Sequence, residues 1–152
     1  MSRGYFEIGI YHTKCRENVG TLWRSAYQLG AVGIFTIGKR YKGQPGDTCK
    51  TPRHIPLRHY ENWEHFMSNR PLGVQLVGVE MGRRPLSTFV HPERAIYLLG
   101  AEDYGLPEDI IFACQSVISL EAVRNLSYNV AVAGSIVMYH RLSSTNNKQG
   151  VK

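Results

Sequence analysis

Residues 125–133 read NLSYNVAVA and lead into the most apolar helix that the sequence predicts, at about residues 128–142. In the first half of that helix, apolar residues occur on every side, so it must be enclosed within its own domain or against a second subunit. Unpaired polar groups are costly at the entry to buried structure. Asn125, Ser127 and Asn129 are therefore candidates for a binding pocket. The alternative is that Ser127 caps the helix and nearby backbone satisfies Asn129.

The segments before this helix alternate between strand and helix character. Apolar runs typical of strands lie at residues 5–11, 33–37, 74–79, 95–100 and 116–120. Three helical patterns lie between these runs. The first extends from a plausible N-cap at Asn18 to Gly30, which ends it; the second covers residues 61–68, and the third follows Pro107. This order predicts an α/β domain with a mostly parallel sheet flanked by helices.

The length and charge favour one domain with a polyanionic partner. With 152 residues the chain has room for a single domain, which we assign to residues 1–142; the polar residues 143–152 are expected to form a disordered tail. Eighteen Lys and Arg residues against twelve Asp and Glu residues give a net charge of +6. This charge favours a nucleic acid over a membrane surface as the partner.

Cysteine usage and the N-terminal residues indicate a protein of the reducing cytoplasm. Cys15, Cys49 and Cys114 are odd in number and contain no CxxC pair, so the sequence predicts neither a disulfide framework nor a zinc site. Charged residues interrupt the first twenty positions, unlike the apolar core of a signal peptide. The longest apolar run, 130–139, is too short to span a bilayer. We therefore expect a soluble, cytoplasmic protein.

Two further segments carry candidate functional residues. Arg24 lies well away from the apolar stripe of the first predicted helix and does not face the core. This position fits a functional arginine, but it also fits one that is merely solvated. The strand at 95–100 leads into GAEDYGLPEDI, in which Gly100 and Gly105 bracket Glu102. Ligands of parallel sheets bind at strand carboxyl ends, and glycines there allow close approach, although a plain turn is the alternative. The pattern is neither GxGxxG nor a P-loop, so a dinucleotide or ATP is not supported.

Residues 39–56 read KRYKGQPGDTCKTPRHIP and predict a long surface loop. Three prolines and two glycines disfavour regular structure there, and the segment is rich in basic residues. The loop is either a mobile connection or a contact for RNA.

Together, three motifs resemble the SpoU (TrmH-type) family of the SPOUT superfamily, which are S-adenosylmethionine-dependent RNA ribose 2′-O-methyltransferases. The first motif is ENVGTLWRSAYQLGA, with matches at Asn18, Gly20, Arg24, Ala26 and Gly30. The second is LLGAEDYGLP, with matches at Gly100, Glu102, Gly105 and Leu106, and the third is SYNVAVA. The order of the motifs and their distance from the C-terminus also match, and the resemblance covers nearly the whole chain.

The resemblance implies a trefoil-knotted α/β fold, S-adenosylmethionine as the cofactor without a metal, and a homodimer with active sites between subunits. By matched position, the cofactor-binding residues would be Val79, Glu80, Gly100, Glu102, Gly105, Ile118, Leu120, Ser127 and Asn129. The catalytic residues would be Arg24, Asn18, Glu102 and Asn129.

The sequence departs from the family pattern at two residues, and its spacing to Ser127 is one residue longer than in the minimal members. Ser119 stands where a proline usually follows the strand residue matched to Ile118, so Val117 or Leu120 could take that place in the pocket. Tyr128 replaces a smaller aliphatic residue between the Ser and Asn of the third motif, which would narrow or reshape the pocket.

The resemblance leaves two roles open for Arg24. The family arginine is often described as the base that activates the ribose hydroxyl. A guanidinium rarely gives up its proton, however, so we favour a role in holding an RNA phosphate and stabilising the developing alkoxide.

The resemblance to minimal, single-domain members points to tRNA as the substrate, with rRNA as the alternative; DNA and a membrane are not expected partners. A rival from another class is a non-catalytic RNA-binding factor that keeps the fold and need not bind the cofactor. The basic residues suggested as phosphate contacts are Arg3, Lys14, Arg16, Lys39, Arg40, Lys42 and Arg53.

Overall fold

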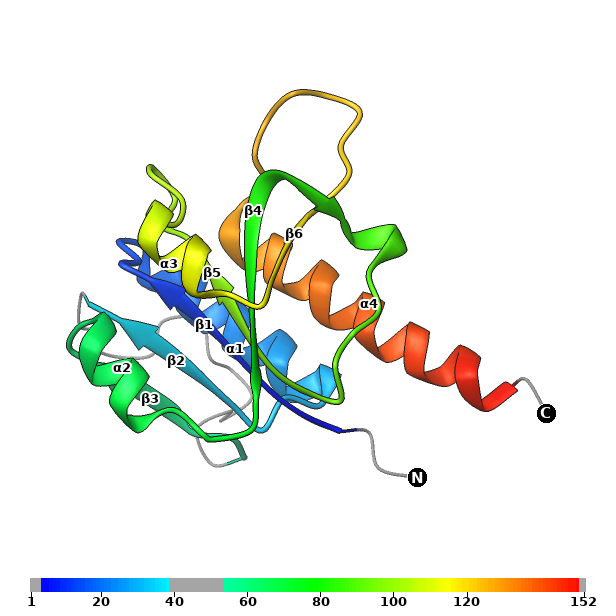
Figure 1. Ribbon diagram of the computed structural model, residues 1–152, viewed down its shortest axis with the longest axis horizontal. Helices are drawn as coiled ribbons and strands as arrows, with labels where there is room; N and C mark the ends of the chain where they lie inside the picture. The colour runs from blue at the N-terminus through cyan, green and yellow to red at the C-terminus, as the bar shows by residue number, and fades with distance from the viewer. Residues whose placement is uncertain (1–3, 39–53, 151–152) are drawn as a thin grey trace.

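The computed structural model describes residues 4–38 and 54–150, whose strands form one six-stranded sheet (Figure 1). The strands are β1 (Tyr5–Tyr11), β2 (Gly33–Ile37), β3 (Leu57–Tyr60), β4 (Gln75–Pro85), β5 (Arg94–Leu99) and β6 (Ser116–Ser119). The helices are α1 (Arg16–Leu29), α2 (Trp63–Asn69), α3 (Glu108–Ala113) and α4 (Val130–Gly150), with a 3₁₀ turn, η2 (Leu86–Thr88). The strand order is β3-β2-β1-β5-β4-β6, and every neighbouring pair is parallel. The predicted α/β class with a mostly parallel sheet is confirmed.

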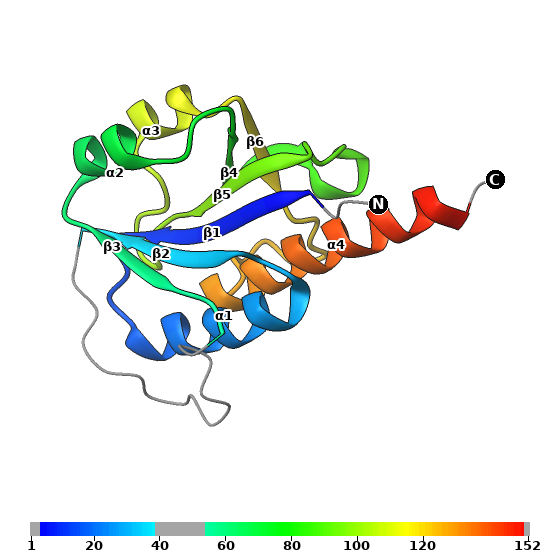
Figure 2. The same cartoon turned by 90° about the horizontal axis from the view of Figure 1, so that it is seen from below.

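Helices cover both faces of the sheet. α2 and α3 lie on one face, and α1 and α4 lie on the other (Figure 2). A sheet covered on both faces needs continuous apolar strands instead of alternating ones. β2 shows this, because all of GIFTI is buried.

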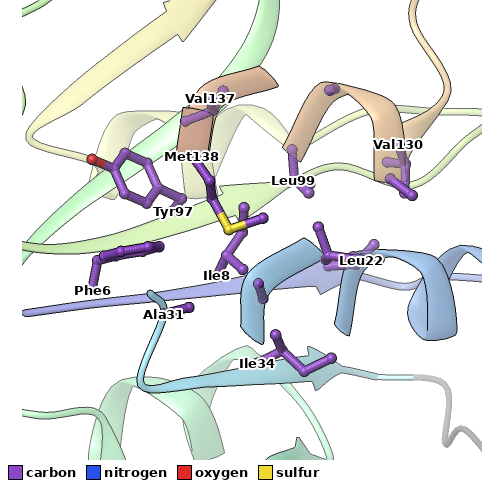
Figure 3. Close-up of a cluster of buried hydrophobic side chains, with 14 of the residues drawn as sticks. Phe6, Ile8, Leu22, Ala31, Ile34, Tyr97, Leu99, Val130, Val137 and Met138 are labelled. Atoms are coloured by element: carbon purple, nitrogen blue, oxygen red, sulfur yellow. The ribbon is translucent and has the colours of Figure 1, made fainter. Parts of the chain in front are cut away.

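α1 and α4 pack together on the sheet through a close-packed cluster (Figure 3). Ile8 of β1, Leu22 of α1, and Val137 and Met138 of α4 are each no more than 1% exposed. Gly134 allows the helices to approach, because a Cβ there would lie 2.5 Å from a methyl group of Leu22. The contact fixes the start of α4 relative to α1, and with it the positions of the first and third motifs.

α4 is longer than the sequence predicts. The predicted end near Leu142 is wrong: residues 143–150, expected to be a disordered tail, continue the helix. No proline or glycine interrupts residues 142–149. Arg141, only 5% exposed, anchors the helix through its guanidinium. The acceptors are the backbone oxygens of Pro92 at 2.6 Å and Glu93 at 2.9 Å and the hydroxyl of Tyr97 at 3.1 Å.

β3 is a strand that the sequence pattern does not predict. Its LRHY sequence has no apolar run, and only Tyr60 is buried. It pairs with β2 along the edge of the sheet, and the pairing is extended by a 3.0 Å hydrogen bond from the Ile34 N–H to the Pro56 oxygen. A partner distant in sequence, and not the local pattern, creates this strand.

β4 is irregular where it passes the carboxyl end of the sheet. Its register with β6 shifts between Val79 and Arg84, so residues 80–83 leave the regular ladder. Gly82 adopts a positive φ of 72° within this segment. Such bulges re-aim side chains, and here the bulge turns Glu80 toward the neighbouring β5 turn.

Among the described helices, none combines the length and apolar character needed to cross a bilayer. The trefoil knot and the homodimer stay predictions.

Candidate functional site

A cavity of about 370 Å³ lies where β4 and β5 end and α4 begins. This volume is within the range of small-molecule binding sites. The bulge of β4, the turn after β5 and the segment before α4 all contribute to its wall. Among the predicted cofactor-binding residues, the lining includes Val79, Glu80, Gly100, Glu102, Gly105, Leu120 and Ser127.

Glu102 is the acceptor that joins the first and second motifs. Its Oε1 accepts hydrogen bonds from the Thr13 hydroxyl at 2.9 Å and the Asn18 amide at 3.1 Å, and its Oε2 accepts from the Lys14 backbone N–H at 3.3 Å. Burial raises the pKa of Glu102, but hydrogen bonds from its own backbone N–H, Asn18 and Thr13 outweigh burial and hold that pKa below its ordinary value. The ionised carboxylate therefore fixes the start of α1 against the GAEDYG turn.

Asn18 carries the connection on to the third motif. Its side chain is buried, and its Oδ1 accepts a 3.0 Å hydrogen bond from the Asn129 amide. The predicted role of Asn18 as a helix cap is wrong, because Cys15 is the N-cap of α1 and Asn18 lies in the first turn. The physical reason is the carboxylate of Glu102, which draws the amide inward.

Asn129 caps α4. Its Oδ1 accepts hydrogen bonds from the N–H groups of Ala131 at 2.9 Å and Val132 at 3.2 Å. These are donors that the first turn of a helix leaves without an intrahelical partner. The cap is thus Asn129 and not Ser127, which lines the cavity; Asn125 is not among the lining residues.

Glu80 and two glycines shape the turn after β5. Glu80 Oε2 accepts from the Leu106 N–H at 2.8 Å, and a backbone bridge joins Ala101 to Gly105. A Cβ on Gly100 would overlap the backbone of Gly105, and a Cβ on Gly105, whose φ is 66°, would overlap the Glu80 carboxylate. The two glycines are therefore required by close contacts within the turn.

The lining of the cavity combines acidic and apolar residues. Glu80, Glu102 and Asp103 belong to its lining, and no basic side chain of the described residues does. Leu99 and Val130 contribute apolar surface and are at most 8% exposed. This combination favours a ligand with a positive charge and an apolar or aromatic portion, and it disfavours a phosphate inside the cavity.

The loop at 121–128 closes one side of the cavity. The Tyr128 hydroxyl donates to the Glu121 backbone oxygen at 2.8 Å, which ties the two ends of the loop together. The Glu121 carboxylate accepts from the Ser87 N–H at 3.0 Å, and this hydrogen bond lowers the pKa of Glu121. Tyr128 therefore shapes the loop, and its ring also lines the cavity.

The described residues offer little support for a metal site or a reactive cysteine. Nowhere in residues 4–38 and 54–150 do three or more His, Cys, Asp or Glu side chains gather as metal ligands. Burial raises the pKa of the Cys114 thiol to about 11, so it stays protonated at neutral pH.

A family model, that of the SpoU rRNA methylase family, matches residues 6–139. The chain belongs to this family. Among curated proteins, no sequence match was found.

Solved structures of SpoU-type methyltransferases share the fold. An AdoMet-bound rRNA methyltransferase from Sinorhizobium meliloti has 24% identity and a TM-score of 0.78 over 93% of this chain. AviRb from Streptomyces viridochromogenes has 18% identity and a TM-score of 0.85 over 95%. This chain spans only 57% and 61% of those two proteins. A structure described as giving insight into 2-OH methylation of C/U34 on tRNA has 20% identity and a TM-score of 0.84, with 95% of this chain and 99% of that one covered.

Some residues assigned from the SpoU resemblance are not part of the cavity lining. Ile118 is fully buried in the core and does not line it, whereas Leu120 does. Asn129 is also absent from the lining, because its amide joins Asn18 to α4. Arg24 is exposed on α1 and does not line the cavity of its own chain. How any of these residues acts on a ligand stays a prediction.

The basic residues assigned to RNA divide into two groups. Lys14 forms a 2.6 Å ion pair with Asp103, and the Arg16 Nε lies 4.0 Å from the Glu17 carboxylate; all four side chains are exposed. The remaining residues, Arg3, Lys39, Arg40, Lys42 and Arg53, lie outside the described residues.

The sequence also missed part of the lining. Met81 and Gly82 enter it through the bulge of β4, and a glycine three residues after the end of the apolar run could have indicated that irregularity. Leu126 and Tyr104 flank residues that were assigned, but an exposed apolar side chain in a loop gives no periodic signal.

Glu102→Gln is expected to lower the free energy of unfolding by about 1 kcal/mol at pH 7, because an amide replaces a partly exposed charged acceptor. The folded pKa of Glu102 lies below its unfolded value, so this stabilisation is present above the unfolded pKa, about 4.3, and is lost as the pH falls through the folded pKa. Urea unfolding from pH 7 to pH 3 should show the difference between wild type and variant shrinking. Glu93→Gln, at an exposed carboxylate outside the network, is the control; a difference independent of pH would contradict the assignment.

Proposed function

We propose that this protein transfers a methyl group from S-adenosylmethionine to the ribose 2′-hydroxyl of a tRNA nucleotide, as a cytoplasmic homodimer. The observation that carries the proposal is the acidic cavity, whose wall unites the second and third motifs and the bulge of β4. Membership of the SpoU family supports the reaction class.

The lining of the cavity fits S-adenosylmethionine. Its carboxylates, Glu80, Glu102 and Asp103, suit a ligand that carries a sulfonium and an ammonium group. Leu99 and Val130 offer apolar surface for an adenine ring. When bound, the cofactor supplies an electrophilic methyl group. The S. meliloti structure and one of AviRb are described with AdoMet, which also supports this cofactor.

The described hydrogen bonds limit what the polar residues of the motifs can do. A ribose hydroxyl must lose its proton to solvent or a base as the new carbon–oxygen bond forms and the carbon–sulfur bond breaks. Glu102, Asn18 and Asn129 hold one another and the start of α4, so we assign them positioning roles. Ser127 lines the cavity and can hydrogen-bond to ribose or cofactor. The charge that stabilises the developing alkoxide is assigned to Arg24.

The position of Arg24 supports a homodimer. Thr21 lines an apolar groove between α1 and α4, and Arg24 lies three residues further along the same side of α1. In the proposed dimer the second copy is seated on this groove and supplies its Arg24 to the partner's cavity, which Arg24 does not line within one chain.

The groove also has the surface that a second copy would bury. Val132, Ile136 and Tyr139 are 46%, 37% and 63% exposed and form one stripe along α4. This stripe explains why α4 is apolar on every side. One side of the helix packs on the core, and the side with the stripe needs another partner.

Different observations support tRNA and rRNA as the substrate. The structure associated with tRNA methylation is matched over 99% of its length, which supports a tRNA substrate for a chain of this size. The family description and the S. meliloti relative name rRNA, so rRNA is the second candidate. Mass mapping of 2′-O-methylated nucleosides in tRNA and rRNA from cells with and without the protein separates them.

Arg24→Ala is expected to lower the methylation turnover of the mapped RNA at saturating RNA by at least about 100-fold, because it removes the charge that stabilises the developing alkoxide. Calorimetry should show unchanged S-adenosylmethionine binding, since Arg24 lies outside the lining. Gln28→Ala, at another exposed position of α1, is the control. Near wild-type turnover for Arg24→Ala would remove this residue from the mechanism, and a wild type that neither binds the cofactor nor methylates RNA would refute the proposed function.

Ile136→Glu is expected to convert the dimer to a monomer, because it places a charge in the centre of the apolar stripe. Light scattering coupled to size exclusion measures the mass, and methylation should be lost together with the dimer. Val90→Glu, at an apolar residue that is 68% exposed elsewhere, should leave both unchanged. A wild-type protein that is monomeric at assay concentration yet fully active would contradict an active site shared between subunits.

A further inference from the structure

Tyr104 projects from the rim of the cavity. Its side chain is 84% exposed, yet it belongs to the cavity lining. No role was assigned to it by the sequence motifs, in which it lies between Glu102 and Gly105. An exposed aromatic ring at the mouth of a binding site is suited to contact a ligand that extends out of that site.

The turn that carries Tyr104 is held from several sides. The Gly105 N–H donates to the Ala101 oxygen at 3.0 Å, and the next N–H, of Leu106, donates to Glu80 at 2.8 Å. On the other side of Tyr104, Glu102 is fixed by its hydrogen bonds to the first motif. The ring is therefore presented from a defined backbone instead of a loose loop.

Lys14 adds a positive charge beside the ring. Its ammonium group lies 5.3 Å from the Tyr104 ring centroid and forms a 2.6 Å ion pair with Asp103. An aromatic ring with an adjacent cation is the combination that binds nucleic acid, because bases stack on the ring and phosphates approach the cation.

We propose that Tyr104 stacks against the base of the nucleotide to be methylated, with Lys14 at the adjacent phosphate. This inference rests on the proposed function in taking RNA as the substrate. A ribose that reaches the cavity carries a base and a phosphate, and both must then lie near the rim, because the acidic lining does not admit the phosphate. Tyr104, the more exposed of the two tyrosines in the lining, offers an aromatic ring there, and Lys14 beside it offers the positive charge.

The adenine of a methyl donor is the competing occupant, and the burial of the lining argues against it. The apolar residues Leu99, Val130 and Ala133 are at most 8% exposed and provide an enclosed surface for that ring. Tyr104, in contrast, faces solvent over most of its surface. Base stacking on an aromatic side chain contributes about 1–3 kcal/mol, or roughly 5-fold to 150-fold in affinity.

The test compares Tyr104→Leu, Tyr104→Phe and Phe112→Leu. Phe112 is the matched control, because it is 92% exposed but lies on α3 outside the cavity lining. Filter binding of end-labelled tRNA isolated from cells lacking the protein gives the RNA affinity, and calorimetry gives the S-adenosylmethionine affinity. Tyr104→Leu should weaken RNA binding at least about fivefold, Tyr104→Phe should stay within about twofold of wild type, and Phe112→Leu should have no effect. Cofactor affinity should be unchanged in all three variants.

Two results would overturn this inference. Equal RNA affinity of wild type and Tyr104→Leu would show that the ring does not stack on a base. Loss of cofactor affinity in Tyr104→Leu would place the ring on the adenine. Failure of the proposed function is distinct: a wild type that binds tRNA through Tyr104 but transfers no methyl group refutes the reaction and leaves the stacking intact.

Discussion

The Glu102 carboxylate is the acceptor on which the rest of the site depends, because segments distant in sequence meet on it. Thr13 and Asn18 donate to it directly, and Asn129 is joined to it through Asn18. An ionised acceptor forms stronger hydrogen bonds than a neutral one, and partial burial makes each donor costly to leave unpaired. The turn after β5, the start of α1 and the start of α4 are thereby held in one arrangement.

This constraint divides the polar residues of the motifs into two groups. Asn18 and Asn129 form their hydrogen bonds inside the network, whereas Ser127 and Glu80 belong to the lining of the cavity. The lining to which Ser127 and Glu80 belong is acidic, which suits a cationic methyl donor. The residues proposed to contact RNA, Arg24 and Tyr104, lie outside the network on exposed surface. In the proposed mechanism the RNA would therefore contact the rim of the cavity and the surface beside it, next to the cofactor.

Local sequence patterns predicted much of the fold, since the boundaries of β1 and β2 and the Gly30 end of α1 follow from apolar runs and a glycine. They failed where a distant partner decides the structure. β3 forms only because β2 offers an edge, and Asn18 leaves the capping position because of Glu102. Most of the cofactor-binding residues assigned from the family pattern line the cavity, but the bulge that brings in Met81 depends on pairing with β6. Ile118, which was assigned from the family pattern, is fully buried in the core and outside the lining, and its role toward the cofactor stays a prediction.

The central claim is that these segments form one cavity for a methyl donor. The most direct measurement is a titration of ¹⁵N-labelled protein with S-adenosylmethionine, followed by amide NMR. The account predicts saturable shifts that cluster in residues 80–82, 99–106 and 126–133, with β3 unaffected. Absence of binding, or shifts confined to the opposite end of the sheet, would contradict it.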